Sequence, residues 1–129
     1  MFEKPEVLTL ASSLAAHAAT RQSAIARNVA NADTPGYRAQ DLPDFAETYR
    51  AESGSALRQT RAGHVGAADG MPDLALSERA AAGTLSPNGN GVSLEAEMVK
   101  AADVKREHDM ALAIYSKSLS ILRASLGRR

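Results

Sequence analysis

The feature that decides how this chain folds is the stretch Asn28-Val29-Ala30-Asn31-Ala32-Asp33-Thr34-Pro35-Gly36-Tyr37-Arg38-Ala39-Gln40-Asp41-Leu42. Pro35 disfavours helical geometry at Thr34, so any helix that comes before must end there. Because Gly36 accepts a positive φ, the four residues from Thr34 to Tyr37 predict a type II turn with Pro and Gly at its centre. Polar side chains that could bond the freed backbone groups at the helix end are those of Asn31, Asp33 and Thr34.

A seven-residue apolar pattern upstream of this turn predicts an amphipathic helix from Val7 to Ala32, about 40 Å long at ~1.5 Å per residue. We call its repeating positions, together with those of the C-terminal helix below, the seam. The N-terminal seam positions are Leu8, Ala11, Ala15, Ala18, Gln22, Ile25, Val29 and Ala32. Many of them are Ala, which permits close approach of another helix but contributes little burial.

A second pattern predicts a helix of roughly 50 Å from Leu94 to Leu126, with Ser93 as its N-cap and Gly127 as its stop. Its seam positions are Leu94, Met98, Ala101, Lys105, His108, Leu112, Tyr115, Leu119, Leu122 and Leu126. Two long helices at opposite ends of one chain favour antiparallel pairing. The predicted fold is therefore mainly α, a coiled-coil-like hairpin of the two terminal helices.

The middle of the chain, residues 39–91, shows little periodicity. A short helix from Asp44 to Arg50 would carry Phe45 and Tyr49 on one side. Most of the Gly residues fall in 51–91, which predicts an irregular segment with room for a small β-hairpin.

The composition argues against several classes of function. Fifteen Lys and Arg balance fifteen Asp and Glu, so no net field favours nucleic acid. No run approaches the ~18 apolar residues of a membrane span, and the N-terminus does not read as a cleaved signal, so we expect no direct membrane insertion. The aromatic content of 4% and the abundance of Ala predict a marginally stable monomer that depends on partners for burial.

No group of residues predicts catalysis. His17, His64 and His108 are far apart in sequence and fit no metal-ligand pattern, and the chain has no Cys. The sequence Gly89-Asn90-Gly91 lacks the features of a phosphate loop and predicts a turn. We therefore expect no enzymatic activity, no metal and no cofactor.

The polar residues of the second helix have two interpretations. Glu95, Glu97 and Glu107 are expected to form a solvated face with Lys100 and Arg106. Lys105 and His108 fall on the seam itself, where they either make ordinary polar contacts or fix the register of an assembly, as polar groups at core positions can.

The sequence from Asn28 to Tyr37 closely resembles the signature near the N-terminus of bacterial flagellar axial proteins, the family of rod, hook and hook-associated proteins. A second stretch, from Ser86 to Met98, is similar to the loop that leads into the last helix of the proximal rod proteins in that family. The resemblance is strong over residues 7–45 and 86–126 and weak between them.

This resemblance implies a structural subunit of the periplasmic rod that supports motility, polymerises through its terminal helices around the export channel and leaves the cytoplasm through the flagellar type III export apparatus. The implied partners are further copies of the chain, other rod proteins and the adaptor FliE, which links the rod to the membrane-embedded ring. Residues 1–38 and 92–129 would form the axial core domain, and residues 39–91 would face outward. The implied assembly motif is Asn28, Asn31, Thr34, Pro35, Gly36 and Tyr37. We expect Tyr37 to anchor it, because its ring can fill a groove while its hydroxyl bonds a polar group.

A different class of protein fits the same helices: a soluble helical-hairpin adaptor or regulator that binds one partner helix without polymerising. The paired motifs at the two ends favour the rod protein, since a generic hairpin needs neither. An adaptor should be folded and helical alone, whereas a rod subunit should have protease-sensitive ends until it assembles.

Overall fold

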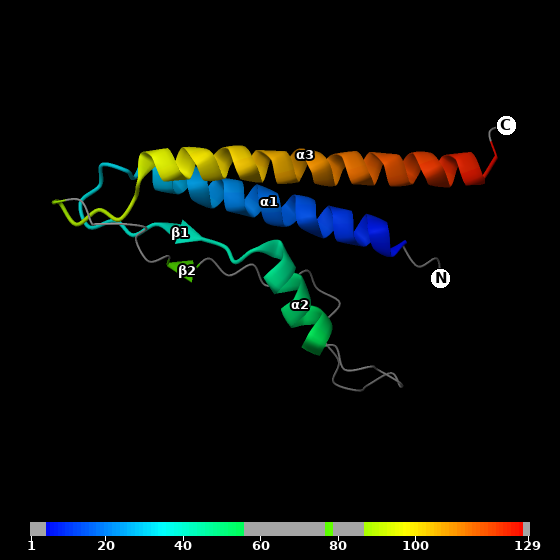
Figure 1. The fold of residues 1–129 in the computed structure, drawn as a ribbon, viewed down its shortest axis with the longest axis horizontal. Coiled ribbons are helices and arrows are strands. Elements are labelled where there is room, and N and C mark those ends of the chain that lie inside the picture. Colours follow the sequence, from blue (N-terminus) through cyan, green and yellow to red (C-terminus); the bar gives the residue numbers. More distant parts are fainter. Residues whose placement is uncertain (1–4, 56–76, 79–86, 128–129) are drawn as a thin grey trace.

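The computed structural model describes residues 5–55, 77–78 and 87–127. The elements follow in the order α1 (Glu6–Ala30), β1 (Gln40–Asp41), α2 (Phe45–Ser55), β2 (Ser77–Glu78) and α3 (Leu94–Ser125). Helices α1 and α3 lie side by side and run antiparallel, β1 follows α1, and α2 points away from the pair (Figure 1). This arrangement confirms the predicted helical hairpin.

Local sequence signals set the ends of α1. The helix begins after Pro5, whose carbonyl accepts bonds from the N–H groups of Leu8 and Thr9 at 2.9 and 3.2 Å. It ends at Asn31, whose N–H bonds the carbonyls of Arg27 and Asn28, both at 3.1 Å. The helix thus ends slightly before the predicted residue, Ala32. At the observed end, the side chain of Asn31 also bonds the helix backbone.

Helix α3 begins at the predicted residue, Leu94, and ends at Ser125, one residue before the predicted end. Ser93 caps the first turn by accepting a hydrogen bond from the N–H of Ala96 at 3.5 Å. Gly127, with φ of 77°, lets the chain leave the helix. At ~1.5 Å per residue α3 is about 10 Å longer than α1, and it extends beyond the start of α1 in Figure 1.

The core between the two helices is narrow and built from small side chains. Ala18, Ile25 and Val104 form its buried centre, and Ala101 packs against them. Ala18 and Ala111 are fully buried, with exposed fractions of 0%. Small side chains at these positions let the helix axes come close, as the alanine-rich seam predicts, but they leave little apolar area to stabilise a single chain.

Enlarging a core alanine should therefore force the helices apart. We expect Ala18→Leu to lower the free energy of unfolding by about 1–3 kcal/mol, the usual cost of overpacking. Urea unfolding followed by circular dichroism measures this loss. The matched control is Ala19→Leu, which adds the same side chain on the exposed side of α1. Equal unfolding midpoints for the two variants would contradict the close approach of α1 and α3.

The contact within the hairpin uses only part of the seam. On α1, Ala11, Ala18 and Ile25 are buried; Leu8 and Ala15 are half-buried, and Val29 is exposed. On α3 the half-buried seam positions are Ala101, His108 and Leu119, whereas the exposed ones are Leu94, Met98, Lys105, Leu112, Tyr115, Leu122 and Leu126. The α3 seam therefore lies largely to one side of the contact with α1.

The residues that α3 buries are Glu97, Val104 and Ala111. The prediction that Glu97 lies on a solvated face was wrong, since only 2% of this residue is exposed. A pattern based on polarity predicts that a carboxylate lies in solvent. The Glu97 carboxylate instead has buried partners on other elements, described below.

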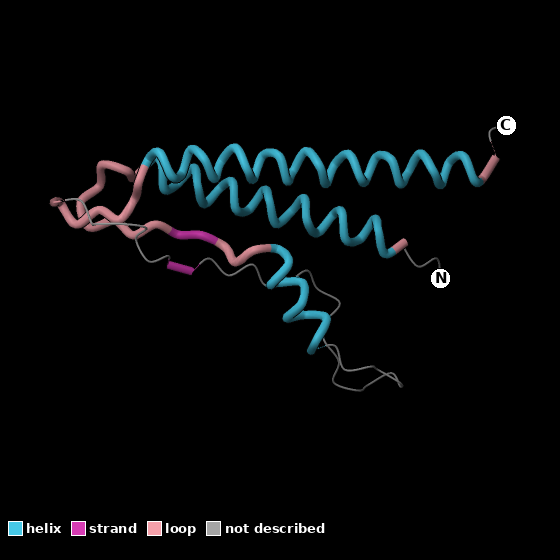
Figure 2. The backbone as a smooth tube through the Cα atoms, in the orientation of Figure 1, coloured by secondary structure: helices cyan, strands magenta, loops and turns pink. Residues whose placement is uncertain are grey.

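The segment after the turn, residues 39–44, runs along α1 and carries β1; we call it the strap. Figure 2 shows it leaving the loop at one end of the hairpin and leading into α2. Strand β1 pairs antiparallel with β2, with Gln40 opposite Glu78 and Asp41 opposite Ser77. The small hairpin predicted within residues 51–91 lies mostly outside the described residues, and the pairing that is described joins β2 to the strap instead.

The predicted short helix is present as α2 and continues to Ser55. Its Phe45 and Tyr49 rings stack with their centroids 5.9 Å apart, and Phe45 makes a T-shaped contact with His17 on α1, with ring centroids 5.6 Å apart. Buried His17 places Nε2 2.9 Å from the Pro43 carbonyl, which can only accept, so Nε2 is the donor. Across the part of the chain that the structure describes, no helix has the length and apolarity needed to cross a membrane.

Candidate assembly site

The turn at the end of α1 has the geometry that its sequence predicts. The N–H of Tyr37 bonds the carbonyl of Thr34 at 3.3 Å, and Gly36 has φ of 70°. Asn31 joins this turn to the helix: its Nδ2 donates to the Arg27 carbonyl at 2.8 Å, and its Oδ1 accepts from the Thr34 hydroxyl at 3.2 Å. The helix end and the turn are thus one hydrogen-bonded unit.

The second motif, before α3, packs directly on this turn. Asn90 is 2% exposed, and its Nδ2 donates to the carbonyls of Asn31 at 2.9 Å and Thr34 at 2.8 Å. Its Oδ1 accepts from the N–H of Val92 at 2.7 Å. One buried amide therefore satisfies backbone groups of both motifs.

Backbone bonds complete the contact between the two turns. The N–H of Gly36 bonds the Asn88 carbonyl at 3.2 Å, and the N–H of Gly91 bonds the Tyr37 carbonyl at 3.0 Å. Gly89 has φ of 78°, and a Cβ on it would lie 3.7 Å from the Cα of Gly36. We call this unit, residues 31–37 with 88–92, the turn junction.

Removing the Asn90 amide should loosen the turn junction. Asn90→Ala removes one of the two hydrogen bonds that the Asn31 and Thr34 carbonyls each accept and leaves the Val92 N–H without its partner. We expect it to lower the free energy of unfolding by about 1–3 kcal/mol. Asn90→Asp keeps the acceptor for Val92 but loses both donors, so it should not restore stability. Denaturant unfolding of both variants tests this, and wild-type stability of Asn90→Asp would show that the two donated bonds contribute little.

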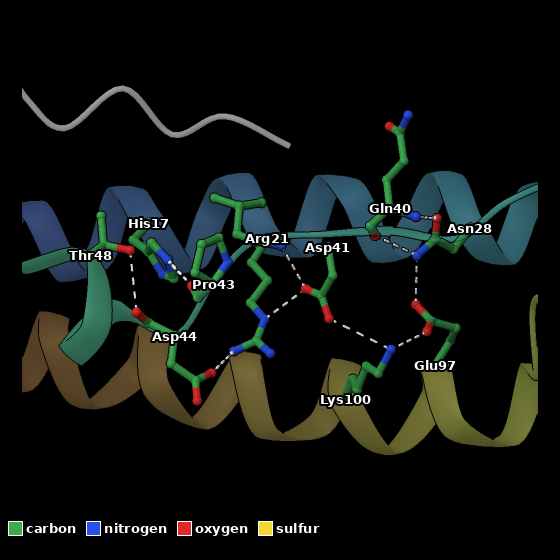
Figure 3. Close-up of polar contacts among 11 residues, drawn as sticks. His17, Arg21, Asn28, Gln40, Asp41, Pro43, Asp44, Thr48, Glu97 and Lys100 are labelled. Carbon is green, nitrogen blue, oxygen red and sulfur yellow. Dashed lines mark hydrogen bonds and ion pairs between the residues drawn. The ribbon is translucent and has the colours of Figure 1, made fainter. Parts of the chain in front are cut away.

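Asn28 links the turn junction to the strap and to α3, and Figure 3 shows its contacts with Gln40 of the strap and Glu97 of α3. Its side chain is fully buried and uses all of its hydrogen-bonding capacity. Nδ2 donates to the Gln40 carbonyl at 2.8 Å and to Glu97 Oε2 at 2.9 Å, while Oδ1 accepts from the N–H of Gln40 at 3.0 Å and from the Tyr37 hydroxyl at 3.4 Å. The amide thus bonds both backbone groups of Gln40, as a neighbouring strand would.

A chain of ion pairs extends from Asn28 along the strap, as Figure 3 shows. Glu97 pairs with Lys100, whose Nζ also lies 3.6 Å from Asp41 Oδ2. Asp41 Oδ1 accepts from Arg21 Nε at 3.0 Å. Glu97 and Asp41 are buried, at 2% and 5% exposed, so their charges require these partners. The network connects α1, the strap and α3.

Arg21 remains positively charged in this setting. Burial lowers the pKa of its guanidinium, but the hydrogen bond to Asp41 and the negative charges of Asp41 and nearby acidic groups outweigh burial and raise the pKa above its ordinary value. Since that ordinary value is already far above neutral pH, Arg21 holds the strap without titrating.

The structure separates the residues of the assembly motif. Asn28 is buried, Asn31 and Tyr37 are half-buried, and Thr34, Pro35 and Gly36 are exposed. The exposed part of the motif therefore forms the tip of the hairpin. The seam positions run along the helices and are not gathered at this tip.

Several residues of the site were not found from the sequence. Asn90 was interpreted only as part of a turn, although an Asn between two Gly is a plausible capping residue. Glu97 was assigned to solvent, and Arg21 and Asp41 were given no role. For Asp41 the available signal was its position four residues after Tyr37, shortly beyond the turn.

Comparison with known proteins supports the assignment that the hairpin and its turn suggest. The family model described as flagella basal body rod protein matches residues 8–38, which span most of α1 and the turn. The flagellar basal body rod protein FlgB of Agrobacterium fabrum is 30% identical over 108 residues, 81% of each chain. The FlgB proteins of Escherichia coli and Salmonella typhimurium are 35% and 36% identical, over 76% and 78% of each chain.

A helical hairpin of the terminal segments, closed by two interlocked turns and matched by these relatives, defines a structural protein of the flagellar basal body rod. More specifically, the chain belongs to the FlgB family of flagellar basal body rod proteins. It is a structural subunit of the rod and works together with other rod components. The comparisons do not support the alternative of a soluble adaptor.

Proposed function

We propose that the chain polymerises within the periplasmic rod through its terminal helices, which pack around the central export channel. The observation that supports this proposal is the apolar surface of α3 that α1 does not cover. On α3 and its C-cap residue Leu126, the large apolar side chains with exposed fractions from 36% to 84% are Leu94, Met98, Val99, Met110, Leu112, Ile114, Tyr115, Ile121, Leu122 and Leu126. A helix that is apolar on several sides is typically buried among other helices.

In this proposal the turn junction fixes the geometry of the axial core domain, residues 1–38 with 92–129. The exposed tip, Thr34 to Gly36, contacts a neighbouring subunit, and the seam supplies apolar burial between helices. Residues 39–91 face outward, in keeping with the direction in which α2 leaves the hairpin (Figure 1). Each subunit then offers different surfaces to its neighbours, so the assembly grows as a helix rather than closing as a dimer.

The remaining partners are inferred from the family resemblance. They are the flagellar type III export apparatus, which would carry the chain to the periplasm, and the adaptor FliE at the base of the rod. The balanced charge of the chain gives no support for a nucleic-acid partner.

Gly36→Val tests the role of the tip. A β-branched residue is strained at φ of 70°, by about 1–3 kcal/mol, so the turn should change shape. In cells that lack the chromosomal gene, the wild-type chain should restore motility, and Gly36→Val should restore it poorly while still reaching the periplasm. The measurements are swarming and the amount of the chain in periplasmic extracts.

The matched control is Asp33→Val, which places the same side chain on the exposed residue just before the turn, where the backbone has ordinary geometry. It should support motility. Normal motility with Gly36→Val would contradict the proposed role of the tip. Failure of the wild-type chain itself to restore motility would count against the rod function.

A further inference from the structure

The loop before α3 contains the same dipeptide twice, since Asn88-Gly89 is followed at once by Asn90-Gly91. The side-chain amide of Asn can react with the backbone nitrogen of the next residue, and Gly obstructs this attack least because it has no Cβ. Each Asn also makes the same local bond, in which its Oδ1 accepts from the N–H two residues later, at 3.0 and 2.7 Å. The two copies therefore differ only in their surroundings.

Asn90 is restrained at each group that the reaction needs. It is 2% exposed, and its Nδ2 donates to the carbonyls of Asn31 at 2.9 Å and Thr34 at 2.8 Å. The nitrogen that would attack it belongs to Gly91, whose N–H is donated to the Tyr37 carbonyl at 3.0 Å. Reaction at Asn90 thus requires the turn junction to open and to admit water.

Asn88 is exposed and has none of these restraints. Among the described residues, neither its Nδ2 nor the N–H of Gly89 has a hydrogen-bond partner. The leaving nitrogen and the attacking nitrogen are therefore both accessible to water, and ring closure at this position breaks no bond of the turn junction.

The bonds that Asn88 does make favour the reaction. Its Oδ1 accepts from the N–H of Asn90 at 3.0 Å, and a donor at this distance stabilises the negative charge that the oxygen gains when a nucleophile adds to Cγ. Its backbone oxygen accepts from the N–H of Gly36 at 3.2 Å. That bond stabilises the negative charge of the peptide group when the N–H of Gly89 loses its proton.

From this geometry we propose that Asn88 is a site of spontaneous deamidation in the folded chain. The Gly89 nitrogen gives its proton to water and bonds to Cγ of Asn88. The bond from Cγ to Nδ2 then breaks, and Nδ2 takes up a proton and leaves as ammonia. Water opens the resulting five-membered succinimide at one of its two carbonyls. The whole sequence consumes one water, releases one ammonia and yields either aspartate or isoaspartate.

Isoaspartate at position 88 would alter the turn junction. In this product the backbone runs through Cβ and Cγ, so it is one atom longer, and the former backbone carbonyl becomes a charged carboxylate. The bond from the N–H of Gly36 and the placement of the Asn90 amide both depend on the present backbone path. We therefore expect the modified turn junction to be less stable. This effect concerns the single chain and does not depend on how the chain assembles.

Peptide mapping tests the proposal on the purified chain, incubated in mildly alkaline buffer either folded or in guanidinium chloride. Trypsin cleaves after Arg79 and Lys100 and so releases both Asn-Gly pairs in one peptide. Fragmentation in a mass spectrometer assigns the change to residue 88 or 90, and isoaspartyl methyltransferase measures the isoaspartate. In the folded chain Asn88 should react at least about ten times faster than Asn90, because Asn90 reacts only after local opening.

The comparison with the unfolded chain decides whether the fold permits the reaction. In guanidinium chloride the two Asn residues should react at similar rates, and Asn88 should react no faster there than in the folded chain. A clearly slower reaction of Asn88 in the folded chain than in guanidinium chloride would overturn the proposal. Equal rates at Asn88 and Asn90 in the folded chain would overturn it as well.

The effect on the turn junction is measured on chains that have already reacted. Each product adds one negative charge, so anion exchange separates modified from unmodified chains. The isoaspartate form should unfold at a lower denaturant concentration than the unmodified chain. The matched variant Asn88→Ser keeps a side-chain oxygen for the N–H of Asn90 but has no amide to lose, so incubation should not change its unfolding midpoint. Equal midpoints for the isoaspartate form and the unmodified chain would overturn the effect on the turn junction.

Discussion

Asn28→Asp should be among the most destabilising single changes in this chain, although it alters the side chain by only one group. We expect the free energy of unfolding to fall by about 3–5 kcal/mol, because the new carboxylate would lie beside the buried carboxylate of Glu97. It would also remove both bonds that Nδ2 donates, to Glu97 and to the Gln40 carbonyl. Urea unfolding at neutral pH, followed by circular dichroism, measures the loss.

The control is Gln22→Glu, the same chemical change on an exposed residue of the same helix. This variant should unfold within about 0.5 kcal/mol of the wild type, as surface substitutions do. If Asn28→Asp matched this control, the buried amide could not be the link between α1, the strap and α3.

Glu97→Ala should have an effect of similar size. Among the described residues it leaves Asp41 as the one anionic partner of Lys100, and it leaves a donor of Asn28 unsatisfied in a buried place. Removing one partner of a buried ion pair costs about 3–5 kcal/mol. The variant should unfold at lower urea concentration, whereas Glu95→Ala, on the exposed side of the same turn, should not.

A double-mutant cycle then tests whether the two side chains act together. Asn28→Ala combined with Glu97→Ala should cost clearly less than the sum of the single changes, because each single change already breaks their shared bond. Strict additivity would mean that the 2.9 Å contact between Asn28 and Glu97 contributes nothing to stability.

The parts of the fold that were predictable depend on residues close together in sequence. Ser93 and Gly127 marked the ends of α3, and Pro35 with Gly36 specified the turn, because capping and turn geometry are decided within a few residues. The periodicity of both long helices was also clear, and two such helices at opposite ends of a chain are readily inferred to pair.

The polar interior was not predictable in the same way. The partners of Glu97 and Asn90 on the first motif lie 69 and 59 residues away, and a single sequence does not show that they meet. Burial of a carboxylate or an amide depends on such distant partners, so a pattern based on polarity assigns these residues to the surface or to a turn.

The displacement of the predicted α3 seam from the contact between α1 and α3 has a related cause. A periodic pattern includes every apolar position at the repeating spacing, whether the side chain there packs within the chain or against another molecule. On α3 the positions that pack on α1 include Glu97, while Met98 and Leu112 are exposed. The seam derived from the sequence is therefore displaced from the contact within the hairpin.

The N–H of Gly91 bonds the Tyr37 carbonyl at 3.0 Å, so the two ends of the intervening segment lie next to each other. The number of residues in this segment therefore does not affect the distance between α1 and α3. Each doubling of the length of such a loop raises the entropic free-energy cost of closing it by only about 0.6 kcal/mol. Sequence beyond the strap can thus be inserted, removed or exchanged between Tyr37 and Gly91 while α1 and α3 keep their register.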